Sequence, residues 1–450
     1  MSNADHKTDR PNLVFVFADQ WRAQALGYAG DPNVHTPNLD RFACENLQFT
    51  RATSGCPVCS PWRATLMTGV YPHRHGMTVN DQCLAEMYDG PFLGECLREG
   101  GYRTAWIGKW HIDGHGRKEP IPPSRRLGFE FWRAYECSHS YQRSYYYDED
   151  DDLHQWEGYD AFAQTDQAGE YLRRRSADGE PFALFLSWGP PHFPIDNAPE
   201  KYKQMYDPAA IELRPNVPED LAENARQWAA GYYAHCTALD DAFANLLESI
   251  ESAGLAEDTI VVFTSDHGDM LGSHRCGLIK QVPQDESVLV PMLMRMPGAA
   301  NGARTIEQVV EYTDLMPTLL GLCGLAVPSA VQGRDLSAPL RDGGDLPDAE
   351  ALLACYLPFH QWKDGYDYRG LRTERYTYVR GHQQPTLLWD NQEDPCQLRN
   401  LVKERPELVA ELDQRLQQKL AAADDGFPPG EEYVRRFGYA LNDAGDIAYS

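Results

Sequence analysis

Cys59 precedes a predicted helix, at a position where its side chain would meet a bound anion. Ser60 is a suitable N-cap, Pro61 suits the first helical position, and Gly69 would end the helix. The free N–H groups and the dipole at a helix N-terminus favour anions, and Arg63 adds a positive charge one turn further on. The sequence therefore predicts an anion-binding position beside Cys59.

Cys56 and Cys59 also form a C-x-x-C pair, which is typical of thioredoxin-like redox sites and of half a zinc site. The sequence lacks a second cysteine pair that would complete a zinc site. A redox dithiol would leave the polar residues described next without a role. Both alternatives stay open from this pair alone, and we expect Cys56 to be a packed core thiol.

Polar side chains follow four apolar runs at the points where predicted strands end. The runs are Leu13–Ala18, Arg103–Ile107, Ala183–Trp188 and Thr259–Thr264. They are followed respectively by Asp19 and Gln20, by Lys109 and His111, by His192, and by Asp266 and His267. In open α/β sheets the site lies outside the carboxyl ends of the strands. We therefore expect these carboxylates, imidazoles and ammonium groups to converge on one region.

Four of these residues form a candidate metal site. Asp19, Gln20, Asp266 and His267 offer three oxygen ligands and one imidazole. Ca²⁺ and Mg²⁺ favour oxygen-rich sites, while the imidazole would also suit Mn²⁺ or Zn²⁺. The sequence therefore predicts one divalent cation at the strand ends.

Continuous apolar strands that alternate with helical segments predict an α/β fold with a doubly wound sheet. Pro291–Met296 is a further expected parallel strand. The expected helices are Pro37–Phe49, Pro61–Thr68, Gly158–Arg175 and Ala222–Ser252. We divide the chain into a catalytic domain, residues 1–350, and a smaller C-terminal α+β subdomain, residues 351–450. In the subdomain, Asp367–Arg380 and Thr386–Asp390 are expected antiparallel strands, Pro406–Ala422 is an expected helix, and Arg341–Asp348 is the connection.

The net charge of the chain limits the classes of binding partner that we expect. The 450 residues carry a formal net charge of −26, which disfavours nucleic acid and anionic membrane surfaces. An anionic substrate would therefore need a locally basic pocket.

Apolar stretches are too short to span a membrane, and the 11 irregularly spaced cysteines do not indicate a disulfide framework. A polar N-terminus predicts a cytoplasmic protein; an exported protein whose leader has been removed is the alternative. Nothing in the sequence indicates an oligomeric state.

The segment from Cys59 to Arg63, followed by Leu66 to Gly69, resembles the signature of the formylglycine-dependent (type I) sulfatases of the alkaline phosphatase superfamily. The resemblance implies an alkaline phosphatase-like, mostly parallel mixed sheet. It also implies hydrolysis of a sulfate monoester, with Cys59 oxidised to formylglycine by a maturase. In that family one oxygen of the hydrated aldehyde attacks sulfur and expels the alcohol. The other oxygen then loses its proton, the diol collapses to the aldehyde, and sulfate leaves.

The same resemblance implies roles for the residues at the strand ends. Arg63 would steady the diol, while Lys109, His111, His192 and Lys280 would contact sulfate or the leaving group. His111 and His192 are the candidate general acids. Asp19, Gln20, Asp266, His267 and the modified Cys59 would bind the metal, for which calcium is the expected ion and Mg²⁺ or Mn²⁺ are alternatives. Many sulfatases have two consecutive aspartates where this chain has Asp19 and Gln20, so Gln20 is the weakest of these assignments.

The substrate is expected to be a sulfated small molecule or saccharide. A phosphonate monoester or phosphodiester hydrolase of the same superfamily is the alternative. The motif that contains Lys109 and His111 resembles that of the sulfatases, and it favours a sulfatase over this alternative. The candidate substrate-binding residues are His115, Glu136, His139 and His274. The segment Leu127–Tyr159 is rich in aromatic residues, which stack on sugar rings in some proteins and pack the core in others. The sequence leaves these two interpretations open.

Overall fold

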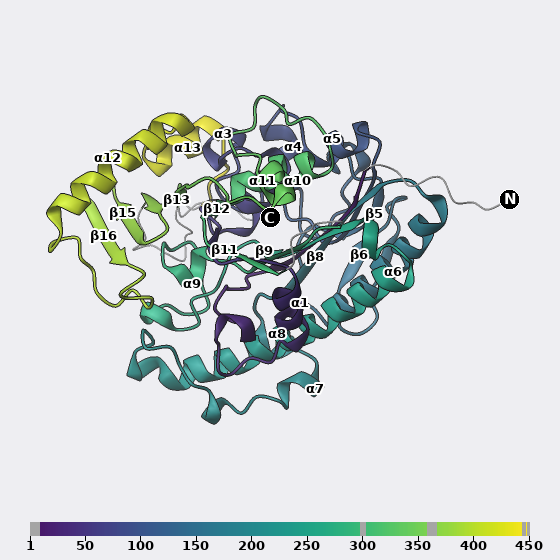
Figure 1. Cartoon of the computed structure of the whole chain (residues 1–450), viewed down its shortest axis with the longest axis horizontal. Coiled ribbons are helices and arrows are strands. Elements are labelled where there is room, and N and C mark those ends of the chain that lie inside the picture. The colour runs from purple at the N-terminus through teal and green to yellow at the C-terminus, as the bar shows by residue number, and fades with distance from the viewer. Residues whose placement is uncertain (1–9, 298–302, 358–366, 443–446, 448–450) are drawn as a thin grey trace.

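The computed structural model describes residues 10–297, 303–357, 367–442 and 447. A ten-stranded sheet, in the order β11-β2-β10-β9-β1-β8-β4-β5-β6-β7, forms the centre of the molecule (Figure 1). Its strands are β1 (Asn12–Asp19), β2 (Leu47–Phe49), β4 (Arg103–Lys109), β5 (Phe131–Tyr135), β6 (Tyr145–Tyr147), β7 (Leu153–Gln155), β8 (Phe182–Pro191), β9 (Thr259–Ser265), β10 (Met292–Arg295) and β11 (Arg304–Ile306). Strands β9, β1, β8, β4 and β5 run parallel to one another. The predicted doubly wound α/β fold is therefore confirmed.

Strand β1 contributes to a hydrophobic core on each face of the sheet. It lies between β8 and β9 and is parallel to both. Successive side chains of a strand point to opposite faces. Accordingly, Phe15 and Phe17 pack in one core, while Val14 and Val16 pack in the other. Because both faces are covered, the central strands are apolar throughout.

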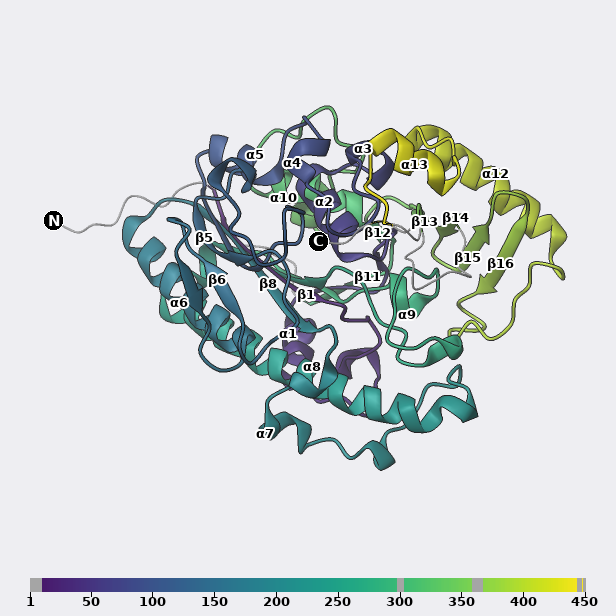
Figure 2. The same cartoon turned by 180° about the vertical axis from the view of Figure 1, so that it is seen from behind.

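Helices cover both faces of the sheet (Figures 1 and 2). The face below the sheet in Figure 1 carries α1 (Pro37–Glu45), α6 (Asp160–Asp178), α7 (Glu200–Lys203) and α8 (Ala222–Ser252). The opposite face carries α2 (Cys59–Thr68), α3 (Pro72–His75), α4 (Leu84–Met87), α5 (Leu93–Glu99), α10 (Leu315–Leu322) and α11 (Ser337–Asp342). A parallel pair, β3 (Ala52–Thr53) and β12 (Val310–Glu311), lies apart from the main sheet, as does the short helix α9 (Asp285–Val288). None of the helices in the described ranges has the length and apolar character needed to cross a membrane.

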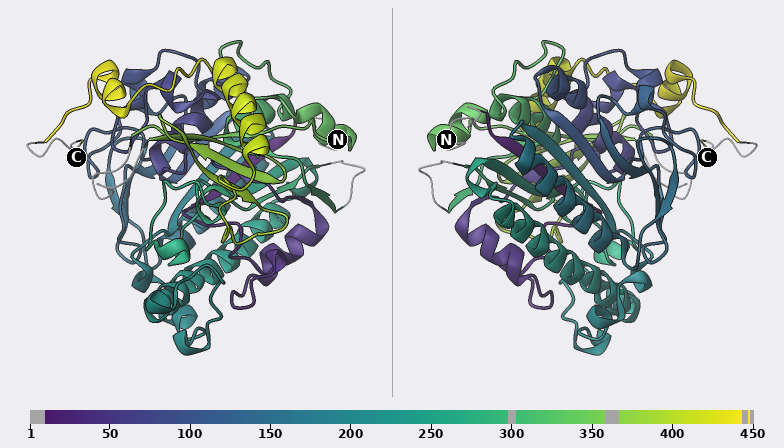
Figure 3. Two further views of the ribbon diagram at one scale, coloured as in Figure 1. Left: turned by 90° about the vertical axis from the view of Figure 1, so that its left-hand side faces the viewer. Right: turned by 90° about the vertical axis from the view of Figure 1, so that its right-hand side faces the viewer.

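A four-stranded antiparallel sheet lies near the C-terminus of the chain, as Figure 3 shows from the side. It consists of β13 (Ala351–Cys355), β14 (Tyr368–Arg372), β15 (Tyr376–Arg380) and β16 (Pro385–Asp390). Helix α12 (Pro406–Ala423) packs against it, and α13 (Gly430–Phe437) follows. Leu412, Leu416 and Leu420 of α12 belong to the same core as Phe15. The expected C-terminal sheet and helix are confirmed, whereas the domain boundary at residue 350 stays a prediction.

Two predicted elements were wrong in part. The helix expected over Pro37–Phe49 ends at Glu45, and residues 47–49 form β2, which pairs with β10 and β11. Strand β10 runs antiparallel to β9, although its apolar run was expected to be a parallel strand. A buried apolar run shows that both faces of a strand are covered, but it does not fix the strand's direction.

Candidate active site

Cys59 is the first residue of α2, and its backbone lies where a helix offers free N–H groups. Val58, rather than Ser60, occupies the N-cap position, with φ −142° and ψ 137°. The Ser60 hydroxyl donates a hydrogen bond to the carbonyl oxygen of His111 at 2.6 Å. The Ser60 N–H donates to the side-chain oxygen of Asn80 at 3.0 Å. The predicted cap was therefore wrong by two residues, because a partner distant in sequence satisfies this end of the helix.

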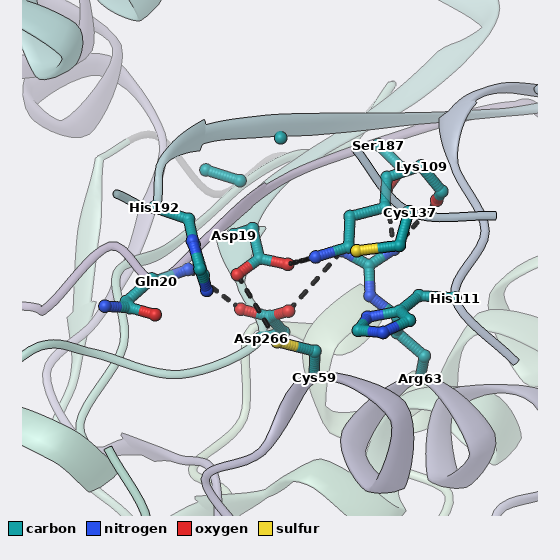
Figure 4. Close-up of polar contacts among 12 residues, drawn as sticks. Asp19, Gln20, Cys59, Arg63, Lys109, His111, Cys137, Ser187, His192 and Asp266 are labelled. Atoms are coloured by element: carbon teal, nitrogen blue, oxygen red, sulfur yellow. Dashed lines mark hydrogen bonds and ion pairs between the residues drawn. The ribbon is translucent and has the colours of Figure 1, made fainter. Parts of the chain in front are cut away.

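The Cys59 thiol lies beside Asp19 and Asp266 from two strand ends (Figure 4), and residues of the loop after β9 complete its surroundings. Its Sγ is 3.5 Å from Asp19 Oδ1, 3.2 Å from His267 Nε2 and 3.1 Å from Lys280 Nζ. Burial and Asp19 alone would raise the pKa of this thiol, but Lys280, Lys109 and His267 outweigh them and hold the pKa well below its usual value. Cys56 packs in the core, where burial raises its thiol pKa to about 12. The Cys59 thiol thus faces the polar cluster, whereas Cys56 is the packed core thiol that the sequence predicted.

Asp19, Cys59, Asp266 and His267 form a fully buried group whose potential ligand atoms all lie within 4.8 Å of one another. The His267 Nδ1–H donates to the carbonyl oxygen of Gly268 at 2.9 Å. Its Nε2 therefore faces Asp19 Oδ1 at 3.7 Å and Asp266 Oδ1 at 3.5 Å. Metal-binding histidines are typically held in this way through their other ring nitrogen. The donor set thus fits a divalent cation, which would also offset the two adjacent carboxylates.

Gln20 lies beside this group. Its side-chain oxygen accepts a hydrogen bond from Lys280 Nζ at 3.1 Å, and its side-chain amide donates to Asp269. The backbone of Gln20 is left-handed, with φ 72°, and its N–H donates to Asp266 Oδ1 at 3.0 Å. Asp269 therefore orients the amide so that its oxygen faces the site. A metal-ligand role for Gln20 stays a prediction.

Three cationic side chains surround the two carboxylates. Arg63 contacts Asp19 Oδ2 at 3.1 Å and Asp266 Oδ2 at 3.4 Å. Lys109 Nζ lies 2.7 Å from Asp19 Oδ2, and Lys280 is the third cation. Burial alone would lower the pKa of Lys109, but Asp19, Cys137 and Cys59 together outweigh it and the pKa is raised. This acidic chain therefore concentrates three buried cationic side chains beside Cys59, which provides the local positive charge that an anionic substrate requires.

The two candidate general acids have different surroundings. The His192 Nδ1–H donates to the carbonyl oxygen of Phe193 at 2.8 Å, and Nε2 faces the ammonium group of Lys280 at 3.0 Å. His192 Nε2 is therefore an acceptor. His111 Nε2 lies 3.1 Å from Asp81 Oδ1. Burial alone would lower the pKa of His111, but Cys137 and Asp81 outweigh it and hold the pKa well above its usual value.

Four further residues at the site were not singled out from the sequence. Cys137 lies next to Lys109 in Figure 4, with Sγ 3.8 Å from His139 Nε2. Burial alone would raise its pKa, but His111 and Lys109 hold it well below the usual value. The others are Asp81, Asp269 and Ser187, whose hydroxyl accepts a hydrogen bond from Arg63 at 2.8 Å. Ser187 lies near a strand end and could have been found by that signal, whereas no local pattern marks Asp81 or Cys137.

The four candidate substrate-binding residues lie in different surroundings. The His139 ring stacks on His192, with centroids 4.6 Å apart. Glu136 Oε1 accepts the N–H groups of Asp113 and Gly114, each at 2.9 Å, and thus holds the loop that follows His111. The other two candidates contact residues elsewhere: His115 pairs with Glu86 and Asp113, and His274 bonds to Asn216. Substrate roles for all four stay predictions.

The aromatic segment Leu127–Tyr159 contributes mainly to the core. Its two tryptophans are buried, with Trp132 0% and Trp156 2% exposed. Tyr135, Tyr141 and Tyr159 are also buried. These rings therefore favour the core-packing interpretation over stacking on a sugar. Within the acidic run, Asp148 accepts N–H groups of its own loop and pairs with His154.

Sequence comparisons match this chain to known sulfatases over most of its length. A sequence model described as sulfatase matches residues 11–325, and one described as the C-terminal part of N-sulphoglucosamine sulphohydrolase matches residues 276–425. An ulvan-active sulfatase of Formosa agariphila is 42% identical over 96% of this chain and 85% of its own length. An endo-4-O-sulfatase of Bacteroides thetaiotaomicron is 31% identical over 93% of each chain.

Solved structures show the same fold. A putative sulfatase, yidJ, of Bacteroides fragilis superposes with a TM-score of 0.85 and 31% identity, covering 95% of this chain and 98% of its own. A phosphonate monoester hydrolase of Agrobacterium radiobacter gives a TM-score of 0.72 with 23% identity over 98% of this chain and 100% of its own. The second likeness supports the alkaline phosphatase-like fold alone. The likeness to the Bacteroides fragilis structure is supported in addition by the sequence matches described above.

Proposed function

The chain belongs to the sulfatase family, and we propose that it hydrolyses a sulfate monoester of a carbohydrate at Cys59. Family membership makes it a sulfuric ester hydrolase and favours this reaction over phosphonate hydrolysis. The observation that carries the proposal is the arrangement at Cys59, where buried cations adjoin a group with metal-ligand geometry. Sulfuryl transfer needs such positive charge around the equatorial oxygens.

The proposed nucleophile is formylglycine formed from Cys59 by a maturase. In the structure the Cys59 Sγ stands in for the oxygens of the hydrated aldehyde. Those oxygens would supply the nucleophile for sulfur when the group is present. Helix α2 places this side chain at its N-terminus, where backbone N–H groups and the helix dipole favour negative charge.

The proposed metal is calcium, held by Asp19, Asp266, His267 and the modified Cys59, with Gln20 as a further oxygen donor. When bound, the ion would polarise the nucleophile and a sulfate oxygen as a Lewis acid. Oxygen donors predominate in this set, which favours a hard cation. Arg63 contacts both aspartates and thereby fixes the carboxylates that face the ion.

The remaining residues would bind sulfate and transfer the proton. Lys109 and Lys280 are positioned to pair with sulfate oxygens, since both ammonium groups lie within the cluster. His111 is the better proton donor to the departing alkoxide, because its surroundings favour the protonated ring. His192 holds a lone pair toward Lys280 and is assigned to positioning that ammonium group.

A sulfated carbohydrate is the proposed substrate because the two relatives described above carry names of that kind: one is called ulvan-active and the other an endo-4-O-sulfatase. The test compares kcat/KM for a panel of sulfated oligosaccharides, including ulvan fragments, with that for a small aryl sulfate. At least one saccharide should exceed the aryl ester. If no saccharide were hydrolysed while the aryl sulfate was turned over well, the proposed carbohydrate substrate would be rejected. The proposed sulfatase reaction would stand.

The reaction itself is tested with a sulfated and a phosphorylated aryl ester assayed side by side. We expect the sulfate ester to be preferred, and peptide mass spectrometry to find the aldehyde or its hydrate at Cys59 in active protein. Chelation, or the substitution Asp266→Ala, should abolish turnover, and calcium should restore it in the chelated wild type only. Full activity in protein that carries the unmodified thiol, or in metal-free protein, would overturn the proposal.

A further inference from the structure

Asp19, Cys59, Asp266 and His267 form one candidate metal site, here called the Cys59 cluster. Outside this cluster, we propose that Cys83, Glu86 and His115 bind a zinc ion. A thiol sulfur, a carboxylate oxygen and a ring nitrogen of these residues lie within 4.8 Å of one another. Cys83 directly precedes α4, Glu86 lies on α4, and His115 lies on the loop that follows β4. This inference goes beyond the proposed function, since none of the three residues belongs to the Cys59 cluster.

The fold brings these two segments together by specific contacts. The Leu84 N–H donates to the carbonyl oxygen of Ile112 at 3.0 Å. Gly114 has φ 67°, and a Cβ there would lie 2.5 Å from the carbonyl carbon of Gln82 and 2.9 Å from the Cys83 nitrogen. Only glycine therefore permits this close approach. The N–H groups of Asp113 and Gly114 are held by Glu136 from the other side. The site is thus built on a fixed backbone.

The hydrogen bonds of His115 leave one ring nitrogen directed at Glu86. The Nδ1 atom lies 2.8 Å from the carbonyl oxygen of Asp113, which can only accept, so Nδ1 carries a proton. Nε2 then faces Glu86 Oε1 at 3.1 Å. Metal-binding histidines commonly donate their other N–H to a backbone carbonyl in this way. A proton on Nε2 would form a hydrogen bond to Glu86 Oε1 only. A metal ion would bind Nε2, Oε1 and Cys83 Sγ together.

The mixture of ligands selects the kind of ion. Zinc accepts thiolate, imidazole and carboxylate together, with bonds of about 2.0–2.3 Å, whereas Ca²⁺ and Mg²⁺ prefer oxygen alone. Tetrahedral bonds of that length place donor atoms roughly 3.3–3.8 Å apart, so atoms that lie within 4.8 Å of one another need to approach by at most about 1.5 Å to close the site. The side chains of Glu86 and His115 are 62% and 38% exposed, so they are free to make this movement. Water would occupy the fourth position.

A bound zinc ion would connect α4 to the loop that begins at His111. That loop is already joined to Glu136 and, through Ile112, to Leu84 of α4, so the ion would add a further attachment. Such an ion would help to position the loop and would take no direct part in the reaction at Cys59.

Zinc binding is measured directly, without any activity assay, so its failure is distinct from failure of the proposed function. Wild type and variants are dialysed against zinc, and bound zinc is counted by mass spectrometry and titrated by calorimetry. The variants are Cys83→Ser and His115→Gln, with His154→Gln as the matched control. His154 also pairs with a carboxylate, at 2.7 Å from Asp148, but no cysteine completes that pair in the described chain. Asp266→Ala removes a ligand of the Cys59 cluster instead.

Cys83→Ser and His115→Gln should each weaken zinc binding at this site more than about 100-fold, exceeding the usual effect of an outer-shell change. His154→Gln and Asp266→Ala should retain it. Cobalt substitution in a Cys59→Ala protein should give a thiolate charge-transfer band that disappears on adding Cys83→Ser. Zinc stoichiometry unchanged in both ligand variants would overturn the proposal. So would loss of this zinc in the Asp266 variant. His115 is partly exposed, so its variant tests the site even if Cys83→Ser fails to fold.

Discussion

Replacing Lys109 with alanine removes one of three cations at the candidate sulfate site and should reduce kcat by a factor of about 10²–10³. That factor is the usual cost of losing one preorganised donor, about 2.7–4 kcal/mol of transition-state free energy. The Lys109 side chain is 1% exposed and lies 2.7 Å from Asp19. Water therefore does not screen its charge, and the loss should reach the upper part of that range.

The fold should tolerate this change better than an isolated buried charge would. Leaving a buried carboxylate without a partner costs roughly 3–5 kcal/mol. Asp19, however, keeps Arg63 at 3.1 Å after Lys109 is removed. We therefore expect a smaller loss of unfolding free energy than that range, and a folded protein on which kinetics can be measured.

Lys419→Ala is the matched control. Lys419 also pairs with a buried carboxylate, at 2.9 Å from Glu311, but on α12 and outside the site. The assay is kcat and kcat/KM on a small aryl sulfate, with Tm measured for each variant. Lys109→Ala should lose activity on every sulfate ester, and Lys419→Ala should lose none. A Lys109 variant that remains within tenfold of wild type would refute the reasoning, as would an equal loss in both variants.

Three other predictions follow from contacts around the site and in the core. Asp81→Asn should lower the pKa of His111, because the Asp81 carboxylate helps to raise it. Since His111 must be protonated to act as an acid, the alkaline limb of the kcat/KM–pH profile should move to lower pH. A limb that does not move would exclude His111 as that acid. His139→Ala should reduce kcat/KM for a sulfated saccharide more than for an aryl sulfate, because binding to remote groups matters only when they are present; equal losses on both would contradict a substrate role. Arg369→Met should destabilise the fold by at most about 3–5 kcal/mol, since it removes the cation from the buried Asp425 carboxylate, which keeps the Phe427 N–H and the Tyr433 hydroxyl as donors. Denaturant unfolding checks this, and a change below about 1 kcal/mol would contradict it.

The residues that follow strand ends could be predicted from the sequence. Apolar runs located β1, β4, β8 and β9, and parallel strands bring their carboxyl ends to one edge of a sheet. Asp19, Lys109 and Asp266 therefore converge without any knowledge of the loops. The motif at Cys59 added the helix N-terminus that completes the cluster.

Residues placed by loops could not be predicted in the same way. Asp81 reaches His111 from a segment 30 positions earlier, and Cys137 lies beside Lys109 in the loop after β5. Nothing in the spacing of these residues fixes such contacts, because irregular loops have no period. Ser60 shows the same limit at short range, since its hydroxyl binds the carbonyl of His111 instead of capping its own helix.

The burial of Cys59 sets a time limit on any enzyme that must modify it. The side chain is 1% exposed in the folded protein, so a modifying enzyme has to reach it before the site closes. The site closes late, because β1 pairs with β8 and β9, which lie far downstream in the chain. At about 5–20 residues per second, the roughly 200 residues between Cys59 and the end of β9 take about 10–40 s to synthesise. During that interval the cysteine remains on an incompletely folded chain. A host that delivers the maturase after this interval would accumulate folded, correctly packed protein whose Cys59 is still a thiol.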